Sequence, residues 1–248
     1  MTNLIAAEFL KLRSTRTFWI VAGLSTALLI LSTVAQLVSD APSDEAEMRS
    51  LLAGAGIAGL FMLILGVVSS AGEYRHGTIT GTFLLAPDRG RVLVAKSLAH
   101  GLTGAVLTVL GLAIILALAL PWLNGDGESL GSLGIGGSDL LDVLAEQGAY
   151  VVLTAMLAVG IGALLTNQVA ALAVVPAILI VIDPVLTLLV EGYGKYSLSG
   201  IWGSLGGEDS DDTGFDILEP FPAALLYFGY VVAITAVTVA LDRRRDVS

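Results

Sequence analysis

The residues that could carry out chemistry are few, and their spacing matches no metal or nucleotide motif. No HExxH sequence occurs, and no apolar run holds a pair of acids. The segment Gly90–Ser97 falls one residue short of a phosphate-binding loop, because Ala95 replaces the second glycine that the loop backbone needs. Cysteine is absent and there are only two histidines, far apart, which argues against metal sites and thiol nucleophiles. We therefore expect no catalytic residue, no metal site and no cofactor in this chain.

Asp183 is the one acid inside a long apolar run, and Pro184 follows it directly. A charge in the middle of a membrane costs about 2.5–3.5 kcal/mol on insertion scales unless it is paired, hydrated or protonated. One interpretation makes Asp183 a polar element of a substrate path, together with Asn167 and Gln168. The other makes these residues structural, with the acid capping backbone N–H groups or pairing across a helix interface. His100, near the start of another apolar run, is predicted to lie at the membrane interface.

The polar segment after the second apolar run is the most informative stretch of the sequence. Residues Thr78–Leu85 are predicted to form two turns of helix, with Ile79 and Phe83 on one side. Pro87 ends this helix, and Arg89 begins the next run. A short helix held by two membrane spans is a stiff lever that could press Ile79 and Phe83 into a groove on a soluble partner. The alternative is an interfacial turn with solvated charges.

The composition indicates the setting in which these residues must work. Of the 248 residues, 55% are hydrophobic and 14% are charged, and the mean hydropathy is +0.86. Average soluble chains hold roughly 45–50% apolar and about 25% charged residues. A soluble domain of this size could not hide so much apolar surface, so the composition predicts an integral membrane protein. The net charge of −10 argues against nucleic acid as a partner.

Six runs are long and apolar enough for a transmembrane helix, which needs about 20 residues. They are residues 17–38, 51–72, 97–123, 147–168, 169–190 and 220–241. The polar Thr166–Gln168 predicts a tight hairpin between the fourth and fifth runs. The loop 124–146 is expected to be solvated, whereas for 191–219 short interfacial helices and a solvated loop both remain open. We expect an all-α integral membrane protein with six transmembrane helices, forming a single domain over residues 1–248.

The basic residues indicate the orientation in the membrane. Ten of the twelve Lys and Arg lie before the first run, between the second and third runs, or in the C-terminal tail. Six spans would put all ten on one side, whereas most acids would lie on the other. The positive-inside rule then places both termini of this multi-pass protein in the cytoplasm.

The sequence holds two further patterns with helical spacing, one before the first apolar run and one inside the runs. Residues 1–16 are predicted to form an amphipathic interfacial helix, because Ile5, Phe9 and Leu12 recur at helical spacing. Small residues four apart, Ala55 with Gly59 and Ala158 with Gly162, favour close helix packing. That packing is either internal to the bundle or a dimerisation face.

Four motifs occur in order along the chain. They are residues 8–13; residues Glu73, Gly77, Thr78, 84–87, Arg89 and Lys96; residues 160–171 followed by Asp183 and Pro184; and residues 243–247. In this order the motifs resemble those of ABC-2 type permease subunits of ATP-binding-cassette transporters, in particular a small six-span, actinobacterial-like branch. Thr166 and Asp183 depart from the family, where a basic residue and Glu are frequent at these positions. The acidic loop 191–220 is also unusual and leaves the substrate unpredictable.

The resemblance implies a transport function without a catalytic site in this chain. Residues 1–16 would be the connecting helix, and the segment around Thr78–Leu85 the coupling helix that docks on a separate cytosolic ATPase, which binds ATP and Mg. The residues assigned to coupling are Glu73, Arg75, Gly77, Thr78, Ile79, Thr82, Phe83, Pro87 and Arg89. Two copies would pair in the bilayer of a bacterial plasma membrane, forming an export path between them. The alternatives are an ion-coupled secondary transporter and a non-transporting membrane anchor or immunity-type protein.

Overall fold

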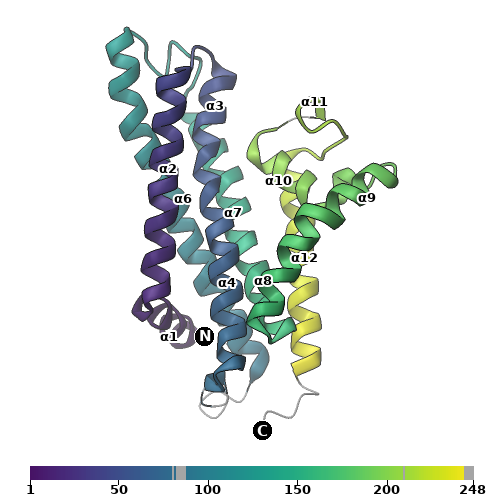
Figure 1. Ribbon diagram of the computed structural model, residues 1–248. Helices are drawn as coiled ribbons and strands as arrows, with labels where there is room; N and C mark the ends of the chain where they lie inside the picture. The colour runs from purple at the N-terminus through teal and green to yellow at the C-terminus, as the bar shows by residue number, and fades with distance from the viewer. Residues whose placement is uncertain (80, 82–87, 209, 243–248) are drawn as a thin grey trace.

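The computed structural model describes residues 1–79, 81, 88–208 and 210–242, and every regular element within these ranges is helical (Figure 1). The elements are α1 (Thr2–Ser14), α2 (Arg16–Ser39), α3 (Glu45–Ala53), η1 (Gly54–Gly56), α4 (Ile57–Arg75), α6 (Arg89–Asp126), α7 (Gly137–Leu165), α8 (Gln168–Ala177), η2 (Ile178–Ile182), α9 (Asp183–Leu189), η3 (Gly194–Tyr196), α10 (Leu198–Gly206), α11 (Ser210–Thr213) and α12 (Pro220–Asp242). The prediction of an all-helical fold is confirmed for this part of the chain.

Five helical segments in the described ranges are apolar and long enough to cross a membrane. They are Arg16–Ser39, Glu45–Arg75, Arg89–Gly125, Gly137–Leu165 and Pro220–Asp242. Four of the six predicted runs lie wholly within these segments and the fourth run, 147–168, does so up to Leu165, as expected of a multi-pass membrane protein. The helices α2, α4, α6 and α7 run side by side in one bundle, with α12 packed against α7 (Figure 1).

The fifth predicted run does not form one regular helix, which differs from the expectation. Residues 168–189 divide into α8, the π-helical turn η2 and α9. Pro176 and Pro184 stand on either side of that turn, and neither nitrogen can donate a helical hydrogen bond. The segment therefore bends, and α9 leans away from α12 (Figure 1).

Small residues hold α4 and α7 close together. A Cβ atom added at Gly162 of α7 would meet the backbone oxygen of Val67 at 2.8 Å, and one added at Gly59 of α4 would meet the Tyr150 ring at 2.5 Å. Ala158 also lies buried in this contact. The predicted small-residue pairs thus serve packing within the chain.

Polar side chains fix where several helices begin. Thr15 accepts a hydrogen bond from the backbone nitrogen of Phe18 at the start of α2, and Asp88 accepts one from Arg91 at the start of α6. Thr166 adopts a left-handed conformation that ends α7, and Asn167 then caps α8. The predicted hairpin at Thr166–Gln168 is therefore a turn of two residues.

The segments between the spans are more ordered than expected. Most of 124–146, predicted as a solvated loop, belongs to the ends of α6 and α7. Within 191–219, α10 packs on α7 and α12, and its Ile201 and Leu205 are fully buried. Hydrophobic burial on the bundle explains why this acidic, glycine-rich region holds a helix.

Several segments meet at one end of the bundle. Lys11 of α1 pairs with Glu73 at the end of α4, and Arg89 at the start of α6 donates to the backbone oxygen of Asp242 at the end of α12. Gln168, which begins α8, lines the same cavity as Glu73. We call this the basic end, because the described Lys and Arg residues other than Arg49 and Lys195 lie in these segments.

Candidate functional site

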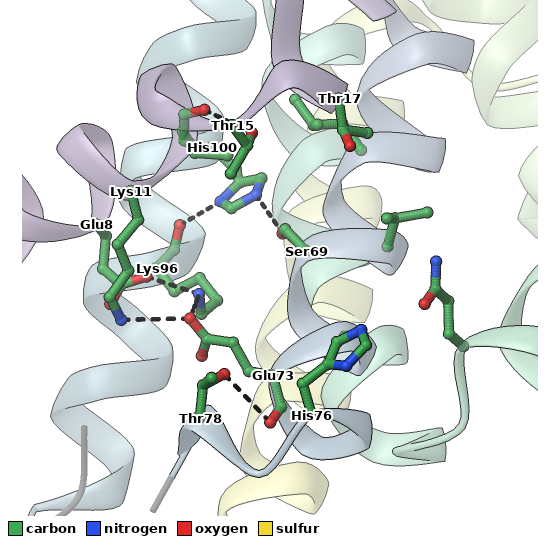
Figure 2. A pocket seen from close by; sticks show the side chains of 15 residues that line it. Glu8, Lys11, Thr15, Thr17, Ser69, Glu73, His76, Thr78, Lys96 and His100 are labelled. Atoms are coloured by element: carbon green, nitrogen blue, oxygen red, sulfur yellow. Dashed lines mark hydrogen bonds and ion pairs between the residues drawn. The ribbon is translucent and has the colours of Figure 1, made fainter. Parts of the chain in front are cut away.

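Four charged side chains from three helices form a closed network at the basic end (Figure 2). Lys96 Nζ of α6 lies 2.6 Å from Glu8 Oε2 of α1 and 3.0 Å from Glu73 Oε1 of α4. Lys11 Nζ lies 2.6 Å from Glu8 Oε1 and 3.2 Å from the same Glu73 oxygen. Two acids and two bases therefore cancel in charge, and each cation bridges both acids.

Three members of this four-residue network are buried. The side chains of Glu8, Lys96 and Glu73 are 5%, 6% and 14% exposed, whereas Lys11 is 42% exposed. Burying an ion costs several kcal/mol unless partners surround it, so each charge here depends on the others. The network replaces apolar packing with an interaction that strongly depends on geometry.

The pKa values of the α1 residues reflect this pairing. Burial alone would raise the pKa of Glu8, but Lys96 and Lys11 outweigh burial and hold it below its ordinary value of 4.5. Burial would lower the pKa of Lys11, but Glu8 and Glu73 raise it above 10.5. Both residues are therefore charged over the physiological range.

His100 extends the network one turn further along α6. Its Nδ1 lies 2.9 Å from the backbone oxygen of Lys96, and its Nε2 lies 2.7 Å from Ser69 Oγ. Because a carbonyl oxygen only accepts, Nδ1 carries a proton. The side chain is fully buried between the helices, whereas its predicted position at the membrane interface stays a prediction.

A cavity of about 500 Å³ opens beside the network, between α1, the start of α2, α4, α6 and α8. Its polar lining includes Glu8, Lys11, Glu73, Lys96, His100, Ser69, Thr15, Thr17, His76, Thr78 and Gln168 (Figure 2). The volume falls in the range of small-molecule pockets.

A second contact at the basic end ties α12 to the neighbouring helices. Tyr74 Oη donates to Asp242 Oδ2 at 2.6 Å, and Arg89 donates to the backbone oxygen of Asp242. Asp242 is buried. The end of α4 and the start of α6, which flank the connection 76–88 in the sequence, are thus both tied to the end of α12.

The predicted coupling residues fall into four groups. Arg75, Gly77 and Thr78 are exposed where α4 ends, with Gly77 in the left-handed conformation that favours glycine. Glu73 and Arg89 are instead tied into contacts between helices. Ile79, expected as an anchor for a partner, is buried within this chain, beside Tyr74 and Val92. Thr82, Phe83 and Pro87, and most of the expected helix Thr78–Leu85, lie outside the described residues.

Asp183 is buried, and its carboxylate is held by neutral donors. Oδ1 accepts from Tyr193 Oη at 2.9 Å, and Oδ2 accepts from the nitrogen of Ser199 at 3.0 Å and from its hydroxyl. These bonds join α9 to the start of α10, as the structural interpretation predicted. Asn167 has a structural role as the cap of α8, whereas Gln168 lines the cavity at the basic end. The three residues do not form one path.

One further sequence pattern is not a site. Residues 127–131 read Gly-Glu-Ser-Leu-Gly, the spacing of a hydrolase nucleophile turn. Ser129 lies in a turn between two helices, where it bonds to Ser132. Both histidines of the chain lie at the basic end, so no base reaches it.

Sequence reasoning missed the pairing of Glu8, Lys96 and His100. One signal was present: Ile5, Glu8 and Leu12 share a helix face, and the structure buries Glu8 and Leu12 while leaving Phe9 39% exposed. An acid on the buried face of an amphipathic helix requires a cation opposite. Nothing in the sequence identified Lys96 as that cation.

Comparison with known proteins adds no family assignment. No protein-family model matches the chain, and no curated protein matches its sequence. The likeness of its motifs to ABC-2 type permeases remains a prediction.

Proposed function

We propose that this chain is the membrane-spanning permease subunit of an ATP-driven exporter, powered by a separate cytosolic ATPase of the ATP-binding-cassette class. The subunit has no catalytic site; it binds the ATPase through the connection 76–88 and pairs with a second copy in the bilayer. The basic end faces the cytoplasm of a bacterial cell, with α8–α9 as the sixth crossing. ATP and Mg are held by the ATPase.

The observation that carries this proposal is the way one connection is joined to four helices. The connection 76–88 begins beside Glu73, which is paired with α1 and α6, and it ends beside Arg89, which contacts α12. A push on this connection therefore reaches α1, α4, α6 and α12 through short polar contacts. Such an arrangement suits a subunit that receives mechanical work from outside.

The bend at η2 favours one alternative, an ion-coupled secondary transporter. Broken helices often line the ion sites of such transporters. However, the carboxylate of Asp183 already accepts three hydrogen bonds from protein donors, which leaves it few lone pairs with which to coordinate a small, bare coupling ion directly. Substrate flux driven by an ion gradient without ATP, in vesicles holding the purified chain, would favour the alternative.

Affinity capture tests the proposal. The tagged full chain is gently solubilised from its native membrane, and its partners are identified by mass spectrometry. We expect a stoichiometric ATPase, and we expect Arg75→Glu at the basic end to reduce its recovery. The matched control is Arg49→Glu on α3 at the opposite end, which should leave recovery unchanged. If no ATP-binding protein accompanies the wild-type chain, the proposal fails.

A further inference from the structure

A second cavity, which we call the lateral cavity, opens between α7, the bent segment α8–α9 and α12. Its volume is about 510 Å³. Aliphatic side chains form most of its wall; they include Leu157, Ile161, Leu164, Val175, Ile178 and Ile234. Those from α7 and α12 belong to helices that are apolar and long enough to cross a membrane, so a bilayer around these helices would enclose the cavity.

One end of the lateral cavity differs sharply from the rest. Asp183, Tyr193, Tyr196 and Tyr230 meet there. Tyr193 donates to the Asp183 carboxylate, and Tyr230 Oη donates to the backbone oxygen of Tyr196 at 2.7 Å. One acid and three aromatic rings therefore gather at the end of an apolar space.

The negative charge at this end is not balanced. The donors to the Asp183 carboxylate are the hydroxyl of Tyr193 and the hydroxyl and backbone N–H of Ser199, all of them neutral. Among the described residues, no Lys or Arg forms an ion pair with Asp183. Hydrogen bonds satisfy the oxygen atoms, but a cation would gain from the remaining charge.

The tyrosine rings favour the same kind of ligand. Lys195 Nζ lies 5.5 Å from the centroid of the Tyr196 ring, so the tyrosines here already attract one cation. Apolar walls alone would select nothing, because lipid tails surround a hydrophobic solute equally well in the bilayer. Selectivity at this depth must come from charge.

We propose that the lateral cavity binds lipophilic monovalent cations. The apolar body of the ligand lies between α7, α8 and α12, and its positive charge lies beside Asp183 and the tyrosine rings. That such cations are the exported substrate rests on the proposed function, whereas binding does not require the ATPase.

A pair of probes of nearly equal size and opposite charge tests the inference. Purified full chain in nanodiscs of zwitterionic phospholipid is dialysed against labelled tetraphenylphosphonium or tetraphenylborate, with empty nanodiscs subtracted. We expect saturable binding of the cation and none of the anion. Equal binding of both ions, or no saturable binding of the cation, would overturn the inference.

Three variants locate the site. Asp183→Asn keeps the shape of the side chain but replaces one carboxylate oxygen by an amide nitrogen and removes the charge, and it should weaken cation binding about tenfold. Asp216→Asn removes an exposed acid from the same outer region and should change nothing. Ala233→Trp fills the cavity from α12, leaves Asp183 intact and should abolish saturable binding. Wild-type affinity in either Asp183→Asn or Ala233→Trp would contradict the assignment.

The outcomes also separate this inference from the proposed function. Cation binding without any co-purified ATPase would keep the site and reject the exporter. A stoichiometric ATPase without cation binding would support the exporter and reject the cation site. Disulfide cross-linking of Ala233→Cys between two copies, with no cation binding, would show that a second copy fills the cavity.

Discussion

Lys96 of α6 and Glu8 of α1 form a buried ion pair, with 2.6 Å between Nζ and Oε2. The pair attaches the N-terminal helix to the bundle at the end where α4 and α6 are connected. Lys96 also pairs with Glu73, so one cation holds three helices together. Lys96 therefore links α1 to both α4 and α6 through one buried charge.

Replacing Lys96 tests how much this buried charge contributes to stability. Lys96→Met should destabilise the protein by about 3–5 kcal/mol, because Glu8 loses its buried cation. Thermal unfolding of the detergent-solubilised chain measures the loss, with Lys195→Met at the opposite end as the control. Adding Glu8→Gln should recover part of it, since the stranded charge is then gone. A loss in Lys195→Met equal to that in Lys96→Met would contradict a special role for the network.

The network should also limit the pH range in which α1 stays docked. The pKa of Glu8 is lower in the folded state than its ordinary 4.5, so its contribution is complete above pH 4.5 and is lost as the pH falls through the folded value. The pKa of Lys11 is higher than its ordinary 10.5, so its contribution is complete below pH 10.5 and is lost as the pH rises further. Melting temperatures measured across pH should fall at both limits. Glu8→Gln should remove much of the fall in melting temperature at low pH. An unchanged fall at low pH in this variant would exclude Glu8 as the cause.

The contact between α4 and α7 predicts a contrast between two glycines of α7. Gly162→Ala should destabilise the protein by about 1–3 kcal/mol, because its new Cβ atom would meet the Val67 oxygen at 2.8 Å. Gly148→Ala, with open space around it, should be neutral or stabilise by up to about 1 kcal/mol. Unfolding midpoints of the two variants give the comparison. Equal effects would mean that the helices are not in close contact at Gly162.

The bent segment α8–α9 predicts a sixth crossing that labelling can detect. The chain has no cysteine, so single cysteines can be labelled without background. A membrane-impermeant maleimide applied to intact cells should label Ser129→Cys and Glu191→Cys, but Ser14→Cys only after permeabilisation. Labelling of Glu191→Cys only after permeabilisation would show that α8–α9 does not cross.

The long helices could be predicted because membrane thickness sets their length and their apolar runs are nearly uncharged. The breaks and turns inside these helices could not be predicted in the same way. Pro176 and Pro184 signalled a break, but whether a helix kinks, ends or forms a π turn depends on neighbours far along the chain. The glycine contacts were predicted as close packing, although only the structure assigned them to α4 and α7.

The candidate site was less predictable than the fold. Glu8 and Lys96 lie far apart in the sequence, and no periodicity connects them. Ile79 was expected to face a partner because helical spacing groups it with Phe83, but spacing does not say whether a face is covered by the same chain. Asp183 was recognised as unusual because it is the one acid inside a long apolar run, whereas its tyrosine neighbours come from a different helix and loop.

Cross-linking to the ATPase is the most direct test of the central claim, that work enters through the connection 76–88. A photo-reactive maleimide on Thr78→Cys, which is exposed at the basic end, should cross-link the co-purified ATPase in native membrane vesicles. The same reagent on Ser129→Cys, at the opposite end, should not. Cross-links to an ATP-binding protein from Ser129→Cys, or from neither position, would contradict the account.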